Sequence, residues 1–480
     1  MLTKQSVTKN AVYFLGSTVA QKAMTFLYFI LVARSFGPLE QGRYSTAIAF
    51  ATFFGVFIDI GLSSALTRES SRVSREEISK YAGQMLLLRF TLGILVYGGM
   101  IGAAYLFGLS HELIQLIFVT GCAALIDVVA TSFWAIIRGL QNLRYEALGG
   151  IIANGTMIVF GGGAMLFHMP ITALVVALFL GSLANLAYVV YVITRNAHIR
   201  FSLRPQIAIL KKLLMLCAPF AGAAIFSRIY TFTDTTLVAR LAGEQFAGYY
   251  AAGSKLVLAL NMIPAALAAS LYPAMSAHFV STQEHIGKLL EKSLQYLALI
   301  ALPLAVSIAT VAPYLVPLFY GESYDQTITV VQYIMPGLVF SFLIFPLGSV
   351  IAATNRQKLN TMIMGVAAGL NILLNILLIP MYAHLGAAVT FSVTYGTIFV
   401  FSLMATHEYW KDSSARVALS LVKICVSALC MALSILVLTQ FIPDVIAIIL
   451  GCLVYLIMIY ITRSLTREMI DEVKHRFRHS

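Results

Sequence analysis

Apolar spans long enough to cross a lipid bilayer occupy most of this 480-residue chain. Stretches of roughly 17 to 25 mostly apolar residues suffice to cross a hydrocarbon core about 30 Å thick, and about fourteen follow one another here. The first two cover approximately residues 11–33 and 44–66. Charged residues make up only 11% of the chain, whereas a soluble domain carries roughly 25%. We therefore expect an all-α polytopic membrane protein with about 14 transmembrane helices.

Basic residues predict the orientation of these helices. Most of the 32 Lys and Arg residues fall in the tails and in every second loop, whereas the alternate loops hold only Arg34, Arg43 and Arg240. The positive-inside rule makes the basic set cytoplasmic, so both termini are expected in the cytoplasm and the protein in the inner (cytoplasmic) membrane. The net charge of +12 then reflects topology and attraction to anionic membrane lipids, and nucleic acid is not needed to explain it.

Short loops argue against an enzyme. The outward-facing connections are brief, such as "HMP" and "GESYDQT", and leave no room for a catalytic domain outside the membrane. The chain also lacks a phosphate-binding loop, a zinc-protease motif and a serine nucleophile elbow. We expect no catalytic residue, metal or cofactor, and place the activity inside the membrane.

An internal repeat predicts how the helices are organised. "LVARSFGPLEQGRYSTA" starts at Leu31 and "LVARLAGEQFAGYYAAG" starts at Leu237, at a constant offset of 206 residues without a gap. Six expected spans lie between the two copies, and because this number is even the repeats are parallel. The repeat glycines suit tight turns between spans, so a structural role is favoured for the motif itself.

The repeat predicts two parallel six-helix lobes. Residues 1–200 form the N-terminal lobe and residues 213–408 the C-terminal lobe. Residues 201–212 are expected to join them as an amphipathic helix on the cytoplasmic surface. Residues 409–480 add helices 13 and 14 and a basic cytoplasmic tail.

Four stretches, taken in order, resemble the Wzx-type oligosaccharide flippases of the multidrug, oligosaccharidyl-lipid and polysaccharide exporter superfamily. They are the first repeat copy, "DIGLSSALTRESSR" at 59–72, "YYAAGSKLVLALNMIPAALAASLYPAMS" at 249–276 and "NILLNILLIPMYAHLGAAVT" at 371–390. The resemblance implies that the two six-helix lobes surround a central cavity, which opens alternately to each side. It also implies a polyprenyl-diphosphate-linked oligosaccharide as substrate, moved from the cytoplasmic to the outer leaflet for cell-surface polysaccharide such as O-antigen. A polysaccharide polymerase and chain-length machinery are the further partners it suggests.

Charged residues within spans are costly and mark candidate functional sites. Polar stripes on the first and seventh spans coincide in the repeat register, which sets Lys22 against Arg228. Two cationic faces suit an anionic diphosphate, which exchanges its hydration for charge-assisted donors. The predicted substrate-binding residues are Lys22, Arg228, Lys255, Gln21, Thr25 and Thr231. The alternatives are internal pairing of these cations with acids, and extension of Lys255 to the interface; such extension is favoured for Arg89 and Lys423.

The intramembrane acids Asp127, Asp234 and Asp59 are candidates for ion coupling through a proton or sodium, with structural pairing as the alternative. Asp59 lies where a turn or helix interruption is equally expected. Asn371 and Asn375, one turn apart, predict hydrogen bonds between helices.

Three other functions remain open. A multidrug exporter of the same superfamily would favour an acidic cavity, whereas basic residues outnumber acidic ones within these spans. A lipid II flippase would suit the same cationic cavity. A membrane polysaccharide polymerase or ligase would need a large outward loop, which the spacing of the spans does not provide.

Overall fold

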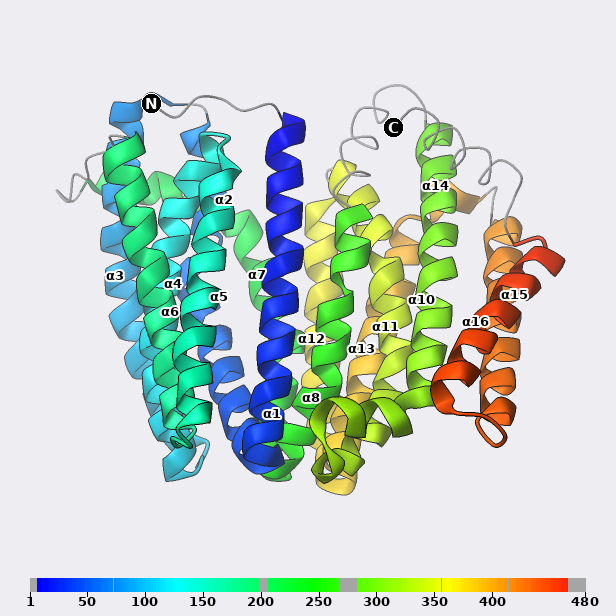
Figure 1. Cartoon of the computed structure of the whole chain (residues 1–480). Coiled ribbons are helices and arrows are strands. Elements are labelled where there is room, and N and C mark those ends of the chain that lie inside the picture. Colours follow the sequence, from blue (N-terminus) through cyan, green and yellow to red (C-terminus); the bar gives the residue numbers. More distant parts are fainter. Residues whose placement is uncertain are drawn as a thin grey trace. The chain divides into compact units, whose positions relative to one another are not determined.

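The computed structural model describes residues 7–71, 73–197, 206–267, 283–354, 356–411 and 414–464 (Figure 1). These ranges are predominantly helical, as the apolar spans predict. Twelve of the described helices are long and apolar enough to cross a membrane. The all-α polytopic prediction is therefore confirmed. Residues 201–205 of the predicted linker and the predicted tail at 465–480 lie outside the described residues.

Two compact units divide the chain. The first contains Met1–Lys255 together with Met364–Thr390, and the second contains Leu256–Ile363 together with Phe391–Ser480. Both copies of the repeat lie in the first unit. The division into lobes at 1–200 and 213–408 stays a prediction.

The first unit starts with α1 (Val7–Asp59), which joins two helices at Gly37. Gly37 has φ 72°, a left-handed conformation that glycine adopts without the clash of a Cβ atom. Pro38 follows, at the start of the second helix, where a missing N–H donor costs no hydrogen bond. The expected span at 11–33 thus lies in the first arm of α1, whereas the expected span at 44–66 covers much of the second arm and runs past its end at Asp59 into the helix that follows.

A second interruption follows at the end of α1. Ile60 and Gly61 have φ 39° and 78°, and α2 (Leu62–Ser70) begins directly afterwards. The turn predicted around Asp59 is confirmed. Four long helices complete this part of the unit and pack side by side (Figure 1): α3 (Arg75–Leu106), α4 (His111–Gly139), α5 (Leu143–Leu166) and α6 (Thr172–Tyr191), which continues as a π-helix at Val192–Ala197.

The second repeat copy spans the junction of α7 (Ile207–Leu241) and α8 (Glu244–Leu260). Gly243 at this junction has φ 119°. Residues 207–212 of the predicted linker form the first turns of α7. Parts of α12 (Gln357–Tyr382) and α13 (His384–Ala405) also belong to the first unit.

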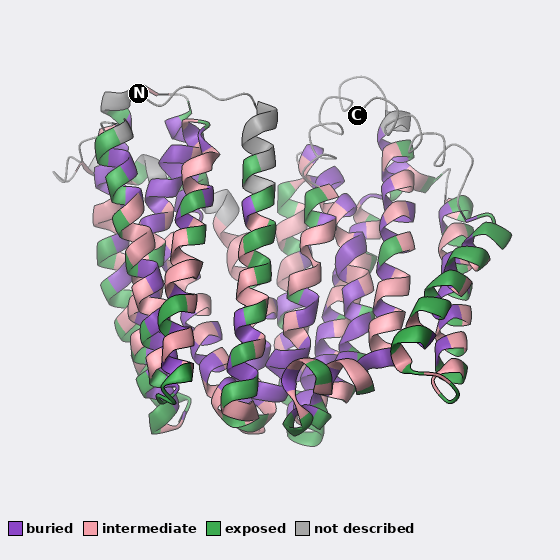
Figure 2. Cartoon of the chain, in the orientation of Figure 1, coloured by how far each residue is buried: buried purple, intermediate pink, exposed green. Residues whose placement is uncertain are grey.

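The second unit is built on α10 (Gln283–Tyr320), which packs against α11 (Asp325–Ala353) and α15 (Ser414–Leu438). A 3-10 turn at Glu322–Tyr324 precedes α11, and the short α14 (His407–Trp410) precedes α15. α15 pairs with α16 (Asp444–Ile461). In Figure 2 the residues of α11 are mostly buried, whereas many residues of α16 are exposed. Nearly all of the exposed α16 residues are apolar, as expected of a helix facing lipid.

Candidate functional site

A buried ion pair joins α1 to α3. The guanidinium of Arg89 donates to the carboxylate of Asp59, to the hydroxyl of Ser63 at 2.8 Å, and to Ser132 and the Val128 carbonyl on α4. The Arg89 side chain is 0% exposed. The interpretation of Arg89 as a residue that extends to the aqueous interface is therefore wrong: an acid on a neighbouring helix holds the charge inside the bundle.

Two of the polar residues on the first arm of α1 face α5. Thr25 donates to the Asn154 side chain at 3.2 Å and to the Gln21 carbonyl at 2.8 Å. Gln21 packs against Gly150, where a Cβ atom would overlap its amide group. Gln21 and Thr25 thus contribute to helix packing, and Lys22 beside them is exposed.

Lys255 on α8 lies close to the same arm of α1. Its ammonium group lies 5.1 Å from the ring centre of Phe29, within the range of a cation–π interaction. Lys255 and Lys22 are within electrostatic range of each other. Because Phe29 follows Lys22 by about two helical turns, both lie on one face of α1. Helices α1 and α8 therefore bring two lysines together.

Arg228 on α7 is exposed, and its guanidinium lies 5.3 Å from the ring centre of Phe232. It is also within electrostatic range of Asp59. Thr231, one turn along, donates to the Ser227 carbonyl of its own helix at 2.7 Å. Asp59 thus has one directly bonded arginine and a second arginine nearby, so the local charge is positive.

A fully buried carboxylate lies at the centre of a second polar cluster. Asp234 on α7 is 1% exposed. It accepts hydrogen bonds from the Tyr250 hydroxyl at 2.7 Å and from the amides of Asn371 and Asn375 at 2.9 and 2.7 Å. The interhelical hydrogen bonds predicted for the two asparagines are confirmed, and their acceptor is the acid itself. The side-chain amide oxygen of Asn375 is buried without a hydrogen-bond partner among the described residues.

The repeat register shows that this acid is specific to one copy. At the offset of 206 residues, Asp234 corresponds to Tyr28 and Tyr250 to Tyr44. Tyr28 and Tyr44 are both buried and close to each other. The same pair of positions therefore meets in both copies, as two tyrosines in the first and as an acid with a tyrosine in the second.

Asp127 on α4 has a different environment. Its side chain is exposed and hydrogen-bonded to Ser182 on α6. Trp134, two turns further along α4, donates to Asn185 on α6 at 3.2 Å. The polar stripe that follows Asp127 along α4 thus connects α4 to α6.

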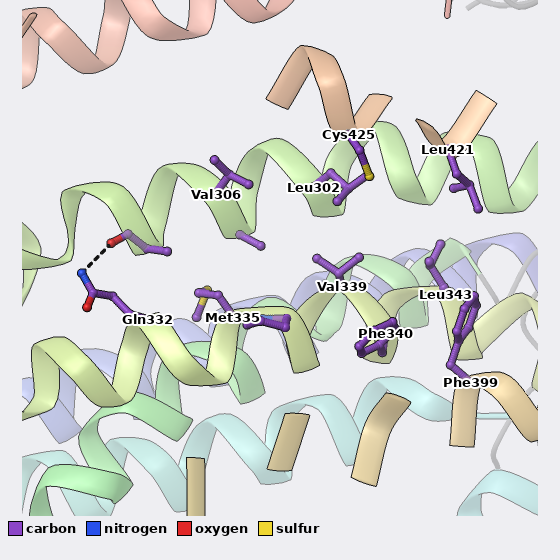
Figure 3. A pocket seen from close by; sticks show the side chains of 13 residues that line it. Leu302, Val306, Gln332, Met335, Val339, Phe340, Leu343, Phe399, Leu421 and Cys425 are labelled. Atoms are coloured by element: carbon purple, nitrogen blue, oxygen red, sulfur yellow. Dashed lines mark hydrogen bonds between the residues drawn. The ribbon is translucent and has the colours of Figure 1, made fainter. Parts of the chain in front are cut away.

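An apolar cavity of about 460 Å³ lies in the second unit (Figure 3). Helices α10, α11, α13 and α15 line it with Leu302, Val306, Met335, Val339, Phe340, Leu343, Phe399, Leu421 and Cys425, among others. Gln332 lies at its edge and donates to the Ala309 carbonyl at 3.4 Å. This cavity is not predictable from the sequence, because apolar residues on four separate helices carry no signal in their spacing.

The long apolar helices and the charged groups held inside them are those of a multi-pass membrane protein. A lipid II flippase, MurJ, in an inward closed conformation superposes with a TM-score of 0.77 at 20% identity, covering 95% of this chain and 100% of that one. An inward-facing multidrug resistance transporter of the MOP superfamily gives 0.66 at 18% identity, covering 83% and 98%. These likenesses establish the fold.

The chain belongs to the "Polysaccharide biosynthesis protein" family, whose profile matches residues 7–279. A profile of the MatE family also matches residues 219–377. A Shigella flexneri protein named "Putative O-antigen transporter" is 24% identical over 415 residues, covering 81% of this chain and 94% of its own. A Staphylococcus aureus capsular polysaccharide biosynthesis protein is 17% identical, covering 81% and 96%.

Proposed function

We propose that this protein is a flippase that moves polyprenyl-diphosphate-linked oligosaccharide repeat units from the cytoplasmic to the outer leaflet by alternating access. Membership in the polysaccharide biosynthesis family supports this function, as does similarity to a relative named for O-antigen transport. The transported unit would serve the synthesis of a cell-surface polysaccharide. The protein would lie in the inner membrane with both termini in the cytoplasm, an orientation supported by the basic loops. A polysaccharide polymerase and chain-length machinery would receive the flipped unit.

The convergence of Lys22 and Lys255 carries this proposal. Two ammonium groups within electrostatic range of each other inside the membrane repel, and each costs free energy to desolvate. A diphosphate placed between them would relieve the repulsion and accept charge-assisted hydrogen bonds from both. Arg228 would supply a third cation on the α7 side. The prenyl tail would stay in the lipid throughout, so its movement between the leaflets would need no transfer of apolar surface into water.

Asp234 is the acid best suited to couple transport to an ion. It is buried, its hydrogen-bond partners are neutral, and the side-chain amide oxygen of Asn375 beside it has no partner among the described residues. Oxygen ligands of this kind suit a hard cation such as sodium, and a buried carboxylate equally suits a proton. Asp59 is less suited, because the buried Arg89 already balances its charge. Asp127 is bonded to Ser182 and keeps an exposed side chain.

Two related substrates compete with this assignment. Lipid II also carries a polyprenyl diphosphate, and the fold is shared with a lipid II flippase, so the cationic pair alone does not separate the two. A multidrug exporter is less favoured, since a substrate site formed by Lys22, Lys255 and Arg228 would repel cationic drugs. We further propose that the protein acts as a transporter without catalytic chemistry.

The experiment is complementation of a strain that lacks the gene. Without the protein, lipid-linked repeat units should accumulate in the inner membrane, and the wild type should clear them. Lys22→Ala combined with Arg228→Ala or with Lys255→Ala should fail to clear them at equal protein level. Lys423→Ala, which removes another basic residue within a span, is the matched control and should rescue fully. Full rescue by both double variants would exclude these residues as the diphosphate site.

A further inference from the structure

The two copies of the repeat contact each other where their helices reverse. The reversal in the first copy is at Gly37 within α1, and in the second at Gly243 between α7 and α8. Both lie on the membrane face that the basic loops predict to be the outer one. The outward-going and inward-going arms of each copy therefore meet those of the other copy at this face.

Two glycines make the contact reciprocal. A Cβ atom on Gly42 would overlap the carbonyl oxygen of Glu244, and a Cβ atom on Gly248 would overlap the carbonyl oxygen of Pro38. Gly42 and Gly248 are equivalent in the repeat, and so are Pro38 and Glu244. The backbones thus touch about a local two-fold axis with no side chain between them. Such a surface can separate and close again without opening a cavity in a packed core.

An ion pair bridges the same contact. The Arg43 guanidinium lies 2.6 Å from the Glu244 carboxylate. Ser110, which caps the N-terminus of α4, donates from its hydroxyl to the other oxygen of Glu244. The cluster therefore connects the second arm of α1, the α3–α4 turn and the start of α8.

Both charges keep a favourable environment when they are apart. Arg43 also pairs with Glu40, one turn before it on α1, at 2.7 Å. Glu244 is the first residue of α8, where the helix dipole favours an acid. Separation therefore leaves neither charge buried and alone. A contact with two tolerated states is the property required of a conformational switch.

We propose that the Gly42–Gly248 contact and the Arg43–Glu244 ion pair form the outer gate of the transport pathway. The gate is closed in this structure and opens when the two repeat copies move apart. This inference rests on the proposed function, because a gate has a role only in a protein that alternates between two accessible states. It gives the repeat motif a role in the contact between the two copies.

The test is a reversible cross-link across the gate. In a variant without the five native cysteines, Arg43→Cys and Glu244→Cys are joined by a short bifunctional thiosulfonate. Clearance of lipid-linked repeat units should be lost on cross-linking and return after reduction. The matched control joins Arg138→Cys to Glu146→Cys, another ion pair of 2.8 Å between adjacent helices of one lobe. That cross-link should leave clearance unchanged. Clearance that persists with the gate cross-linked would overturn the proposal.

A second measurement separates the gate from the substrate assignment. Lys255→Cys is placed in the cysteine-free protein and labelled with a membrane-impermeant maleimide added from the outside. Adding Gly42→Ala, which obstructs closure, should raise the labelling rate, and Gly55→Ala on the same helix, which meets only open space, should not. The gate cross-link should suppress labelling. A labelling rate that changes neither with Gly42→Ala nor with the gate cross-link would refute the gate. If labelling responds to both changes, but the cysteine-free protein that keeps Lys255 does not move lipid-linked oligosaccharide, the proposed function is refuted instead.

Discussion

Neutralising Asp59 should destabilise the protein more than its partly exposed side chain suggests. Asp59→Asn keeps the size of the side chain and an oxygen that can accept from Arg89, but it removes the negative charge. The Arg89 side chain is 0% exposed, whereas that of Asp59 is 34% exposed. The variant therefore leaves a fully buried guanidinium without its directly bonded counter-ion.

The magnitude follows from this asymmetry. Removing one partner of a buried ion pair costs about 3 to 5 kcal/mol. Solvent at Asp59 screens part of the interaction, and Ser63, Ser132 and the Val128 carbonyl still bind the guanidinium, so we expect about 2 to 3 kcal/mol. Adding Arg89→Met should recover most of this loss, because the double variant buries no charge.

A denaturant titration of the purified protein in detergent measures this change in the free energy of unfolding. Glu322→Gln, which neutralises an exposed acid, is the control and should shift the free energy of unfolding by no more than about 0.5 kcal/mol. Equal stability of Asp59→Asn and the wild type would show that the ion pair does not hold Arg89 in the bundle. If the double variant is less stable to denaturant than Asp59→Asn alone, then Arg89 stabilises the fold even without its partner.

Two further predictions concern a glycine contact and the buried acid. Gly161→Ala should cost about 1 to 3 kcal/mol of unfolding free energy, because the new methyl group overlaps the Tyr28 hydroxyl. The neighbouring Gly162→Ala, which meets only open space, should be neutral or slightly stabilising; equal losses for the two would contradict the packing described. Asp234→Asn keeps the shape of the polar cluster but removes its charge, so substrate movement in reconstituted vesicles should stop responding to imposed sodium and proton gradients. An unchanged response to both gradients would exclude Asp234 from coupling.

Much of the fold was predictable from the sequence because membrane helices leave strong signals. Span length and the repeat predicted the helices, and "DIGLSS" predicted the interruption after Asp59. Residues that share one helix face follow from spacing alone, as with Lys22 and Phe29. The repeat glycines likewise predicted a tight turn between the spans, and one such turn lies at Gly37.

Contacts between distant segments were not predictable, since spacing along one helix does not reveal which helix lies opposite. Arg89 was expected to extend to the interface, yet it pairs with Asp59 on another helix. The packing of Gln21 against Gly150 on α5 also carries no signal in the sequence, and its role in the substrate site stays a prediction. Asp234 stood out as an acid within a span, whereas its partner Asn371 lies 137 residues further along the chain.

The central claim is that a pair of lysines recognises the diphosphate of a lipid-linked oligosaccharide. Purified protein in vesicles, supplied with a fluorescent polyprenyl-diphosphate oligosaccharide and with the same glycolipid on a phosphate-free linker, tests it directly. We expect only the diphosphate lipid to move between the leaflets. This movement should be lost in the double variant Lys22→Met with Lys255→Met and retained in Lys423→Met. Equal movement of both lipids, or full activity of the double variant, would contradict it.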